Sequence, residues 1–324
     1  MKWFLRGAAL VFAVIVIALV FMRVPDTDAA EMRAKYGGEP SQFITLDDGL
    51  EVHYRDEGPR DATPLVLLHG SNADLHTWEP WVQRLSARYR VIRFDQIAHG
   101  LTGPAQDDDY ALSSFVADVD EVTRKLGLEQ FVLAGNSMGG NIAAAFALDH
   151  PERLTGLVLI DASGAPVERE GGGNIFFTLA SMPGAGSVLS TITPRSLVER
   201  SLSQSVANQE IVTDEAIDRY WELARYPGNR AATLKRFATP RSSFTAEDIA
   251  TIAVPTLVMW GELDSLVPYD AANWYMEALP EATLVSYADI GHLPMEEAPN
   301  RSATDLAIWI DGVLGAAAAA EFAP

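Results

Sequence analysis

The sequence predicts an α/β fold in which a mostly parallel eight-stranded sheet carries helices on both faces and an inserted helical lid. Short, continuously apolar runs alternate with helical stretches along most of the chain, as strands buried on both faces do. Residues 166–250 break this alternation, because they contain helical pieces but no convincing buried strand. A structureless loop of that length would be improbable, so this stretch is predicted to be a helical insertion.

The strand candidates begin with a hairpin. Residues 43–46 and 50–54 flank the turn Asp47-Asp48-Gly49, and the second run alternates apolar with polar residues. Six later runs are buried-strand candidates, at residues 65–68, 91–94, 131–134, 157–160, 256–260 and 283–285. Helical periodicity marks residues 78–88, 113–126, 138–149, 271–279 and 300–314. Because helices connect consecutive strands, most neighbouring strands are expected to be parallel.

These patterns divide the chain into segments. We expect an α/β core made of residues 42–165 and 251–314, interrupted by the lid of residues 166–250. A polar and charged linker, residues 24–41, precedes the core. An alanine-rich tail, residues 315–324, follows the core and is expected to be flexible.

Residues 1–23 are predicted to be a membrane anchor or a signal segment. Lys2 and Arg6 precede an apolar run of about 16 residues that Arg23 closes, and with the arginines at the interfaces the segment reaches the roughly 20 residues that cross a bilayer. A signal peptide needs small residues at its cleavage site, which residues 27–30 match poorly. We expect an uncleaved anchor with the rest of the chain extracytoplasmic, because positive charges stay on the cytoplasmic side. Cleavage would instead release a secreted or periplasmic protein.

The composition excludes several classes of protein. Apolar residues make up 48% of the 324 residues, enough for a large core, and the formal charge is −20. Nucleic acid is not expected as a partner, because binding its phosphates needs clustered Lys and Arg. The chain has no cysteine, no His-x-x-x-His pair and no calcium-loop pattern. We accordingly expect no disulfide, no metal and no other cofactor.

A candidate nucleophile lies in the string Gly135-Asn136-Ser137-Met138-Gly139. It follows a predicted strand and opens a predicted helix, which is the context that a G-x-S-x-G nucleophile elbow requires. The turn is so tight that Ser137 is expected to be strained, and the two glycines avoid clashes across it. The helix N-terminus would favour negative charge developing at Ser137.

A serine hydroxyl needs a base, and the base needs an acid. Of the six histidines only His150 and His292 follow Ser137, and His150 ends a helix before a proline. His292 follows the last strand, and functional residues of α/β sheets lie in the loops at the carboxyl ends of the strands. Asp264 follows the preceding strand and would orient His292 and stabilise its protonated form. Glu262 and Asp161 are competing acids, although Asp161 is expected to take part in turn and cap bonding.

The oxyanion hole should use two backbone N–H groups. We assign them to Met138, directly after the nucleophile, and to Ser71, in the loop that follows the strand of residues 65–68. His69 is expected to support that loop. Candidate pocket residues are Asn72, Trp78 and, from the lid, Trp221.

At these motifs the chain resembles the α/β-hydrolase superfamily, in the lidded branch that includes meta-cleavage-product C–C hydrolases, epoxide hydrolases, haloalkane dehalogenases and small esterases. The resemblance covers residues 42–314. It rests on His69-Gly70, Asp95 with His99-Gly100-Leu101-Thr102-Gly103-Pro104, Gly135-Asn136-Ser137-Met138-Gly139-Gly140, Gly261 with Asp264 and Pro268, and Gly291-His292. The chain order Ser137, Asp264, His292 is that of the family's catalytic triad.

Departures from the family patterns reduce the number of enzyme classes to which the chain can belong. Epoxide hydrolases and dehalogenases have an aspartate nucleophile, whereas this chain has Ser137. The string around Ser137 resembles that of the C–C hydrolases, but their glycine-rich loop after the His-Gly pair is replaced by Ser71-Asn72-Ala73-Asp74. Ala98 stands where relatives often have glycine, and nothing in the sequence explains it.

We therefore predict a serine hydrolase that cleaves a carboxylic ester or related acyl compound through an acyl-enzyme, with a small-molecule substrate and no metal. A C–C bond hydrolase of the meta-cleavage type and a cofactor-free perhydrolase, similar to haloperoxidases, would use the same triad and stay open. A ligand-binding module without turnover is a further alternative. The sequence does not name the substrate, because the lid and loops shape the cavity, and it does not set the oligomeric state.

Overall fold

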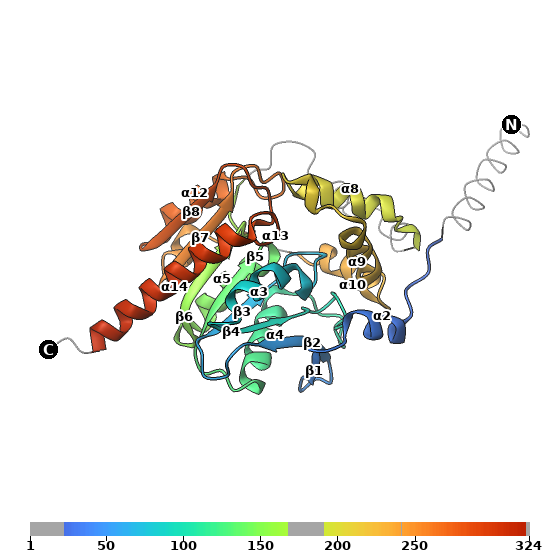
Figure 1. The fold of residues 1–324 in the computed structure, drawn as a ribbon, viewed down its shortest axis with the longest axis horizontal. Helices are drawn as coiled ribbons and strands as arrows, with labels where there is room; N and C mark the ends of the chain where they lie inside the picture. Colours follow the sequence, from blue (N-terminus) through green and yellow to red (C-terminus); the bar gives the residue numbers. More distant parts are fainter. Residues whose placement is uncertain (1–22, 168–190, 241, 322–324) are drawn as a thin grey trace, which may run out of the picture.

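The computed structural model describes residues 23–167, 191–240 and 242–321. Its centre is an eight-stranded sheet in the order β1-β2-β4-β3-β5-β6-β7-β8 (Figure 1). The strands are β1 Gln42–Thr45, β2 Glu51–Glu57, β3 Pro64–Leu68, β4 Arg90–Phe94, β5 Phe131–Asn136, β6 Leu154–Ile160, β7 Thr256–Gly261 and β8 Ala282–Tyr287. The β1–β2 and β2–β4 pairs are antiparallel and all others are parallel, which confirms the predicted hairpin and mostly parallel sheet.

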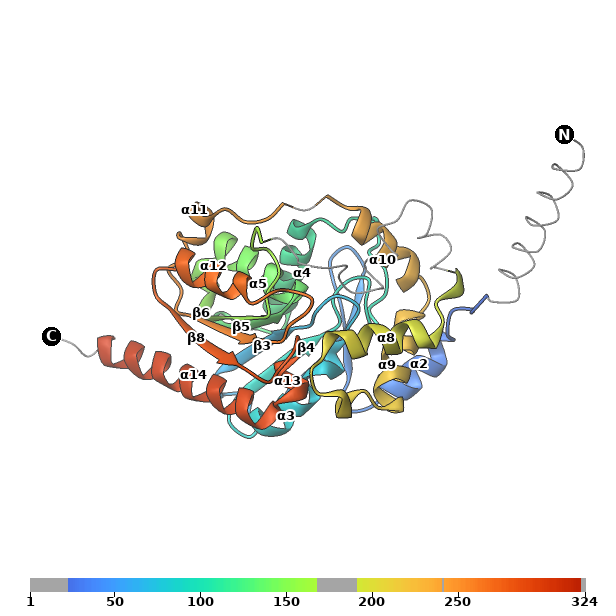
Figure 2. The same cartoon turned by 90° about the horizontal axis from the view of Figure 1, so that it is seen from above.

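Helices cover both faces of the sheet (Figure 2). One face packs against α4 Leu112–Lys125, α5 Met138–Asp149, α11 Ala246–Ile249 and α12 Asp270–Ala278. The other packs against α3 Glu79–Leu85, α13 Pro294–Glu297 and α14 Pro299–Glu321. The short 3-10 helices are η1 Leu75–Trp78, η2 Pro151–Arg153 and η3 Gln209–Ile211.

The central strands β3, β5, β6 and β7 are mostly apolar because both of their faces pack against a core. In β3 the side chains of Val66 and Leu68 belong to the core under α4 and α5, whereas Leu65 and Leu67 belong to the core under α3 and α14. All four are fully buried. Successive side chains of a strand point to opposite faces, so a strand covered on both sides buries both sets of its side chains.

Among the described residues of the β6–β7 connection, three α-helices precede α11. They are α8 Arg195–Ser205, α9 Asp214–Ala224 and α10 Asn229–Ala238, and we call them the insertion. Figures 1 and 2 place the insertion together at one end of the molecule. No strand occurs among the described residues of this connection, and residues 168–190 lie outside the description.

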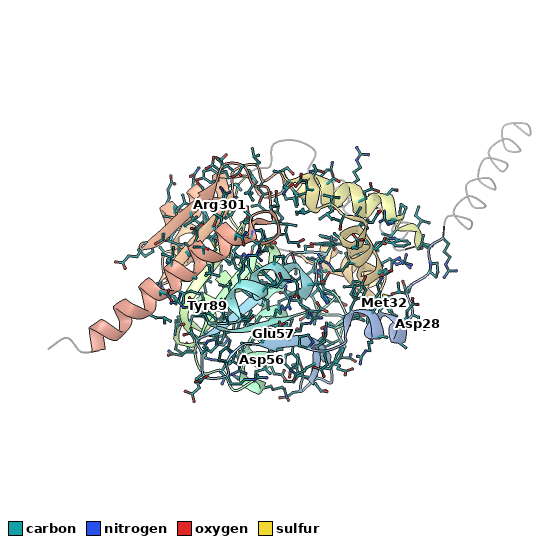
Figure 3. The ribbon with its side chains drawn as sticks, in the orientation of Figure 1. Asp28, Met32, Asp56, Glu57, Tyr89 and Arg301 are labelled. Carbon is teal, nitrogen blue, oxygen red and sulfur yellow. The ribbon has the colours of Figure 1, made fainter. Side chains whose placement is uncertain are left out.

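The stretch predicted to be a linker contains a helix, α2 Ala29–Tyr36, which lies beside the insertion (Figure 3). Asp28 caps its N-terminus by accepting a hydrogen bond from the Glu31 N–H. Met32 is buried against the insertion and the loop after β4. The sequence pattern does not indicate this helix, because Met32 is its only buried side chain and its neighbours are polar or small.

The two chain ends concern the predicted tail and the predicted anchor. Helix α14 continues to Glu321, into the alanine-rich stretch predicted to be a flexible tail, because alanine has the highest helix propensity. Apart from Arg23, the predicted anchor of residues 1–23 lies outside the described residues. Within the part of the chain that is described, no helix has the length and apolar character needed to span a membrane.

Candidate active site

Ser137 lies in a strained turn between β5 and α5. Its backbone has φ 55° and ψ −114°, which a residue other than glycine adopts only where the surrounding structure imposes it. A Cβ atom on Gly135 would lie 2.1 Å from the carbonyl oxygen of Gly139, and one on Gly139 would lie 2.2 Å from that of Leu68. Only glycines fit these two positions, so the turn depends on them. It leaves Ser137 at the N-terminal end of α5, lining a cavity.

His292 and Asp264 are hydrogen-bonded to each other beyond the ends of β8 and β7. The distance between His292 Nδ1 and Asp264 Oδ2 is 2.6 Å. A carboxylate can only accept, so Nδ1 carries the proton and the other ring nitrogen, Nε2, is left as an acceptor. The second Asp264 oxygen accepts from the backbone N–H groups of Leu266 and Val267, at 2.7 and 3.1 Å. Asp264 is therefore held by three donors in a buried position.

The loop that carries His292 is fastened by Glu297 of α13. The Glu297 carboxylate accepts from the backbone N–H groups of Gly291 and Leu293, at 3.1 and 3.2 Å. It also accepts from Ala207 and Asn208, just after α8, at 2.8 and 2.9 Å. One buried carboxylate thus ties the histidine loop to the insertion.

A second carboxyl group, that of Asp161, lies beside the pair. Asp161 follows β6 with φ 44°, and its Oδ1 accepts from the Gly261 N–H at 3.0 Å. One oxygen or ring nitrogen from each of Asp161, Asp264 and His292 lies within 4.8 Å of the others. Burial, and then the negative charge of Asp264, raise the pKa of Asp161 well above its usual range. Burial and the neighbouring carboxyl group of Asp264 therefore favour the protonated form of Asp161.

The loop after β3 closes over Ser137 from the other side. A Cβ atom on Gly70 would lie 3.2 Å from the Cβ of Ser137, so the backbone approaches the serine as closely as glycine allows. His69 supports the loop: its Nε2 accepts from the Gln96 N–H at 3.0 Å, and its Nδ1 donates to the Gly70 carbonyl at 2.8 Å. Burial lowers the pKa of His69, which keeps the ring neutral for these two roles.

Arg236 of α10 connects the insertion to this loop and to the start of α5. Its Nη1 donates to Ser71 Oγ at 2.8 Å and lies 3.2 Å from Met138 Sδ, and its Nη2 donates to Asn72 Oδ1 at 3.0 Å. The arginine is fully buried. Ser71 and Met138, the two residues whose backbone N–H groups are predicted to form the oxyanion hole, thus contact one guanidinium group.

Described residues of the core and the insertion line a cavity of about 100 Å³ beside Ser137. Its walls are mostly apolar or small, with polar groups near Ser137. The core supplies Gly70, Ser71, Asn72, Ala73, Asn136, Ser137, Leu266, His292 and Leu293. The insertion and the residue before it supply Thr193, Val198, Ser201, Leu202, Ser205, Tyr220, Ala224, Arg230, Thr233 and Leu234.

The predicted site residues are distributed unequally around this cavity. Ser137, His292, Ser71 and Asn72 line it, and Asp264 lies behind His292. The two tryptophans are not among the described residues that line it. Trp78 is fully buried with its ring 5.3 Å from that of Trp81. Trp221 donates from Nε1 to the Thr193 carbonyl at 2.9 Å and stacks on Arg225.

Sequence reasoning missed three groups of the site: Arg236, Glu297 and the role of Asp161 as a neighbour of Asp264. For Asp161 a signal was available, because it follows a strand that is adjacent to β7 in the sheet. Arg236 and Glu297 lie on helices with no motif, and only their burial distinguishes them from surface charges.

Comparisons with known proteins agree with this geometry. Residues 63–299 match the family model described as alpha/beta hydrolase fold. The chain is 27% identical to a 2-hydroxy-6-oxo-2,4-heptadienoate hydrolase of Pseudomonas putida, over 77% of this chain and 88% of that protein. It is 25% identical to Lipase 3 of a Moraxella species, over 83% of this chain and 84% of the lipase. The crystal structure of a bacterial membrane phospholipase A is similar, with a TM-score of 0.71 and 25% identity over 97% of this chain and 99% of the other.

Proposed function

Because the chain belongs to the α/β hydrolase fold family, we propose that it is a serine hydrolase that cleaves a carboxylic ester through an acyl-enzyme. Ser137 is the nucleophile, His292 the base and Asp264 the acid that orients the base. The observation that carries the proposal is the 2.6 Å bond between His292 and Asp264, in a loop that lines the same cavity as the strained Ser137. This combination supplies a serine with a base of fixed tautomer.

The chemistry divides into two half-reactions. His292 Nε2 removes the Ser137 proton as Oγ attacks the carbonyl carbon, and the proton then passes to the departing alcohol. Water next attacks the acyl-enzyme, with His292 again as base, and releases the acid and free Ser137. In both steps the negative oxygen is bound by the N–H groups of Ser71 and Met138, which are worth about 3–4 kcal/mol of barrier for each donor.

The surroundings of the site favour a substrate with an acyl chain. The cavity walls from the insertion include Val198, Leu202 and Leu234, which offer no hydrogen bonds to a polar substrate. We assign residues 166–250 the role of a lid over this cavity. We assign residues 1–23 the role of a membrane anchor, a role that suits the similarity to a membrane phospholipase A.

A C–C bond hydrolase is the second candidate. It is favoured by the string Gly135-Asn136-Ser137-Met138-Gly139-Gly140 and by the similarity to a heptadienoate hydrolase. The two candidates differ in the bond that they break and not in their nucleophile. Parallel turnover measurements on a p-nitrophenyl ester and on a vinylogous diketone of the meta-cleavage type separate them, and we expect the ester to be the better substrate.

The test uses the full chain in detergent and a fluorophosphonate probe, followed by p-nitrophenyl esters of increasing chain length. We expect labelling at Ser137 that Ser137→Ala and His292→Ala abolish, while the exposed control Ser113→Ala leaves it intact. A folded protein that neither reacts with the probe nor turns over any ester would refute the proposal.

A further inference from the structure

The cavity contains one fixed charge from a side chain that the proposed reaction does not use. Arg230 of α10 is the only Lys, Arg, Asp or Glu among the described residues that line it. The rest of the lining from the insertion is apolar or uncharged. A cation placed in such a wall raises the question of which negative group it faces.

The bonds of Arg230 leave one side of its guanidinium group unused. Nε and Nη2 both donate to Asp26 Oδ1, at 3.0 and 2.6 Å. Nη1 is buried and has no hydrogen-bond partner within the described ranges of the chain. A buried donor without a partner costs free energy, and a guanidinium group binds oxyanions through two neighbouring nitrogens. The unused donors therefore favour an anionic ligand.

The position of Arg230 on α10 gives its distance from the reacting atoms along the helix axis. Arg236, six residues further along the same helix, contacts Ser71 and Met138 beside the nucleophile. With a rise of 1.5 Å per residue, Arg230 lies about 9 Å from the level of Arg236 along the helix axis. Thr233 and Leu234 line the cavity between the two levels. An anion at Arg230 would thus be separated from the scissile ester by a short spacer, comparable to the glycerol unit of a lipid.

The charged groups around Arg230 are not balanced, so a further negative group would be favourable there. Burial, and then the positive charge of Arg230, lower the pKa of the neighbouring Arg225. Glu222 is already engaged by Lys35 and by the Tyr36 hydroxyl, at 2.6 and 2.7 Å. Asp26 is 44% exposed, so water screens its attraction to Arg230. The local balance is three cations against two carboxylates, in a chain whose formal charge is −20.

We propose that Arg230 forms an anion-binding subsite of the cavity and that the substrate is an anionic amphiphile, an ester with a phosphate or carboxylate group a short spacer away from its carbonyl. The inference rests on the proposed ester hydrolysis at Ser137 and names its substrate class. The acyl chain occupies the apolar part of the cavity, and the anion accepts hydrogen bonds from Arg230 Nη1.

The test compares substrates in pairs that differ only in the anion, using the full chain in detergent. The first pair is an acylglycerol phosphate and the monoacylglycerol with the same acyl chain. The second is mono-p-nitrophenyl adipate and p-nitrophenyl hexanoate. We expect wild type to prefer the charged member of at least one pair in kcat/KM, and Arg230→Gln to lower that preference about 10- to 100-fold, as loss of a charge-assisted hydrogen bond would. The pair that responds identifies phosphate or carboxylate as the anion.

Three further variants separate recognition from folding. Arg230→Lys keeps the charge and should retain part of the preference. Asp26→Asn removes the competing carboxylate and should raise the preference, whereas a role of Arg230 in holding the N-terminal stretch predicts the same loss as in Arg230→Gln. Arg195→Gln is the matched control, because Arg195 also pairs with two carboxylates in the insertion but does not line the cavity.

The outcomes distinguish this inference from the proposed function. A wild-type enzyme that hydrolyses esters through Ser137 but prefers the neutral member of both pairs overturns the subsite alone. So does an Arg230→Gln variant with an unchanged preference, or an Asp26→Asn variant with the same loss. Absence of Ser137-dependent turnover of every ester in both pairs overturns the proposed function instead.

Discussion

The carboxyl ends of β5–β8 and the insertion contribute to the same cavity in different ways. At the strand ends, Ser137, Asp161, Asp264 and His292 are placed by the backbone, because parallel strands end at one edge of the sheet. The insertion instead reaches the site with long charged side chains, above all that of Arg236. The difference teaches that the sheet positions the candidate catalytic groups through its backbone, whereas the insertion supplies about half of the cavity wall through side chains.

The two regions also differ in how their buried ionisable groups are stabilised. At the strand ends, Asp264 accepts three hydrogen bonds, whereas burial and Asp264 raise the pKa of Asp161 beside it and favour its protonated form. In the insertion the buried charge stays ionised and is shared with the core. Arg219 of α9 lies 3.5 Å from Asp74 and 3.7 Å from Glu296. Arg219 thus joins the insertion to the core through charged groups, beside the apolar contacts of Leu202 and Ile217.

The largest expected effect is the difference in kcat between variants of the two carboxyl groups at the strand ends. Asp264→Asn should lower kcat for a p-nitrophenyl ester by about 10⁴-fold, because the amide no longer selects the right histidine tautomer. Asp161→Asn should lower it by no more than about 10-fold, since an amide resembles the neutral acid that the pKa shift implies. Circular dichroism of both variants controls for folding. Equal losses would mean that Asp161 shares the role assigned to Asp264.

A smaller effect is expected from the insertion's contact with the oxyanion loop. Arg236→Met should lower kcat about 10- to 100-fold with little change in KM, because Ser71 and Asn72 lose the donors that hold them. The exposed neighbour Lys235→Met, which removes only a surface pair with Asp108, is the control. A loss confined to KM would show that Arg236 acts on substrate binding and does not support the oxyanion loop.

The smallest effect concerns Asp118 of α4, a carboxyl group outside the site, and it tests whether burial and neighbouring negative charges favour the protonated acid there. Burial, followed by the charges of Asp48, Glu121 and Asp107, raises the pKa of Asp118 from 3.8 to about 7. Below the unfolded pKa both states hold the proton. Between the unfolded pKa of 3.8 and the folded pKa of about 7, the unfolded state has released the proton while the folded state still holds it, so wild type loses stability as the pH rises across that window. Asp118→Asn avoids this loss.

Urea unfolding at pH 4 and pH 8 measures that difference. Asp118→Asn should be more stable than wild type at pH 8 by about 1–2 kcal/mol, after allowance for solvent screening, and nearly equal to it at pH 4. A difference that does not change with pH would show that the carboxyl group is not neutral in the folded protein.

Much of the core was predictable because its signals are local. The hairpin, the six parallel strands and the sharp turn at Ser137 each depend on a few consecutive residues, and they occur where the sequence predicts them. Helix α2 was missed because it buries a single side chain. From sequence alone, a tryptophan that lines a cavity cannot be distinguished from one that packs in a core, as Trp78 does, since the side chain is large and apolar in either place.

The sequence by itself determined the order Ser137, Asp264, His292 and the strand after which each residue falls, because a strand, a turn and a helix are encoded within about ten residues. Only the tertiary structure decided that Asp161 lies beside Asp264, that Arg236 reaches Ser71 across 165 positions, and that Arg230 faces the cavity. The physical reason is that burial and charge pairing depend on which distant segments meet. A neutral aspartate and an unpaired arginine donor therefore have no signature in the chain until it folds.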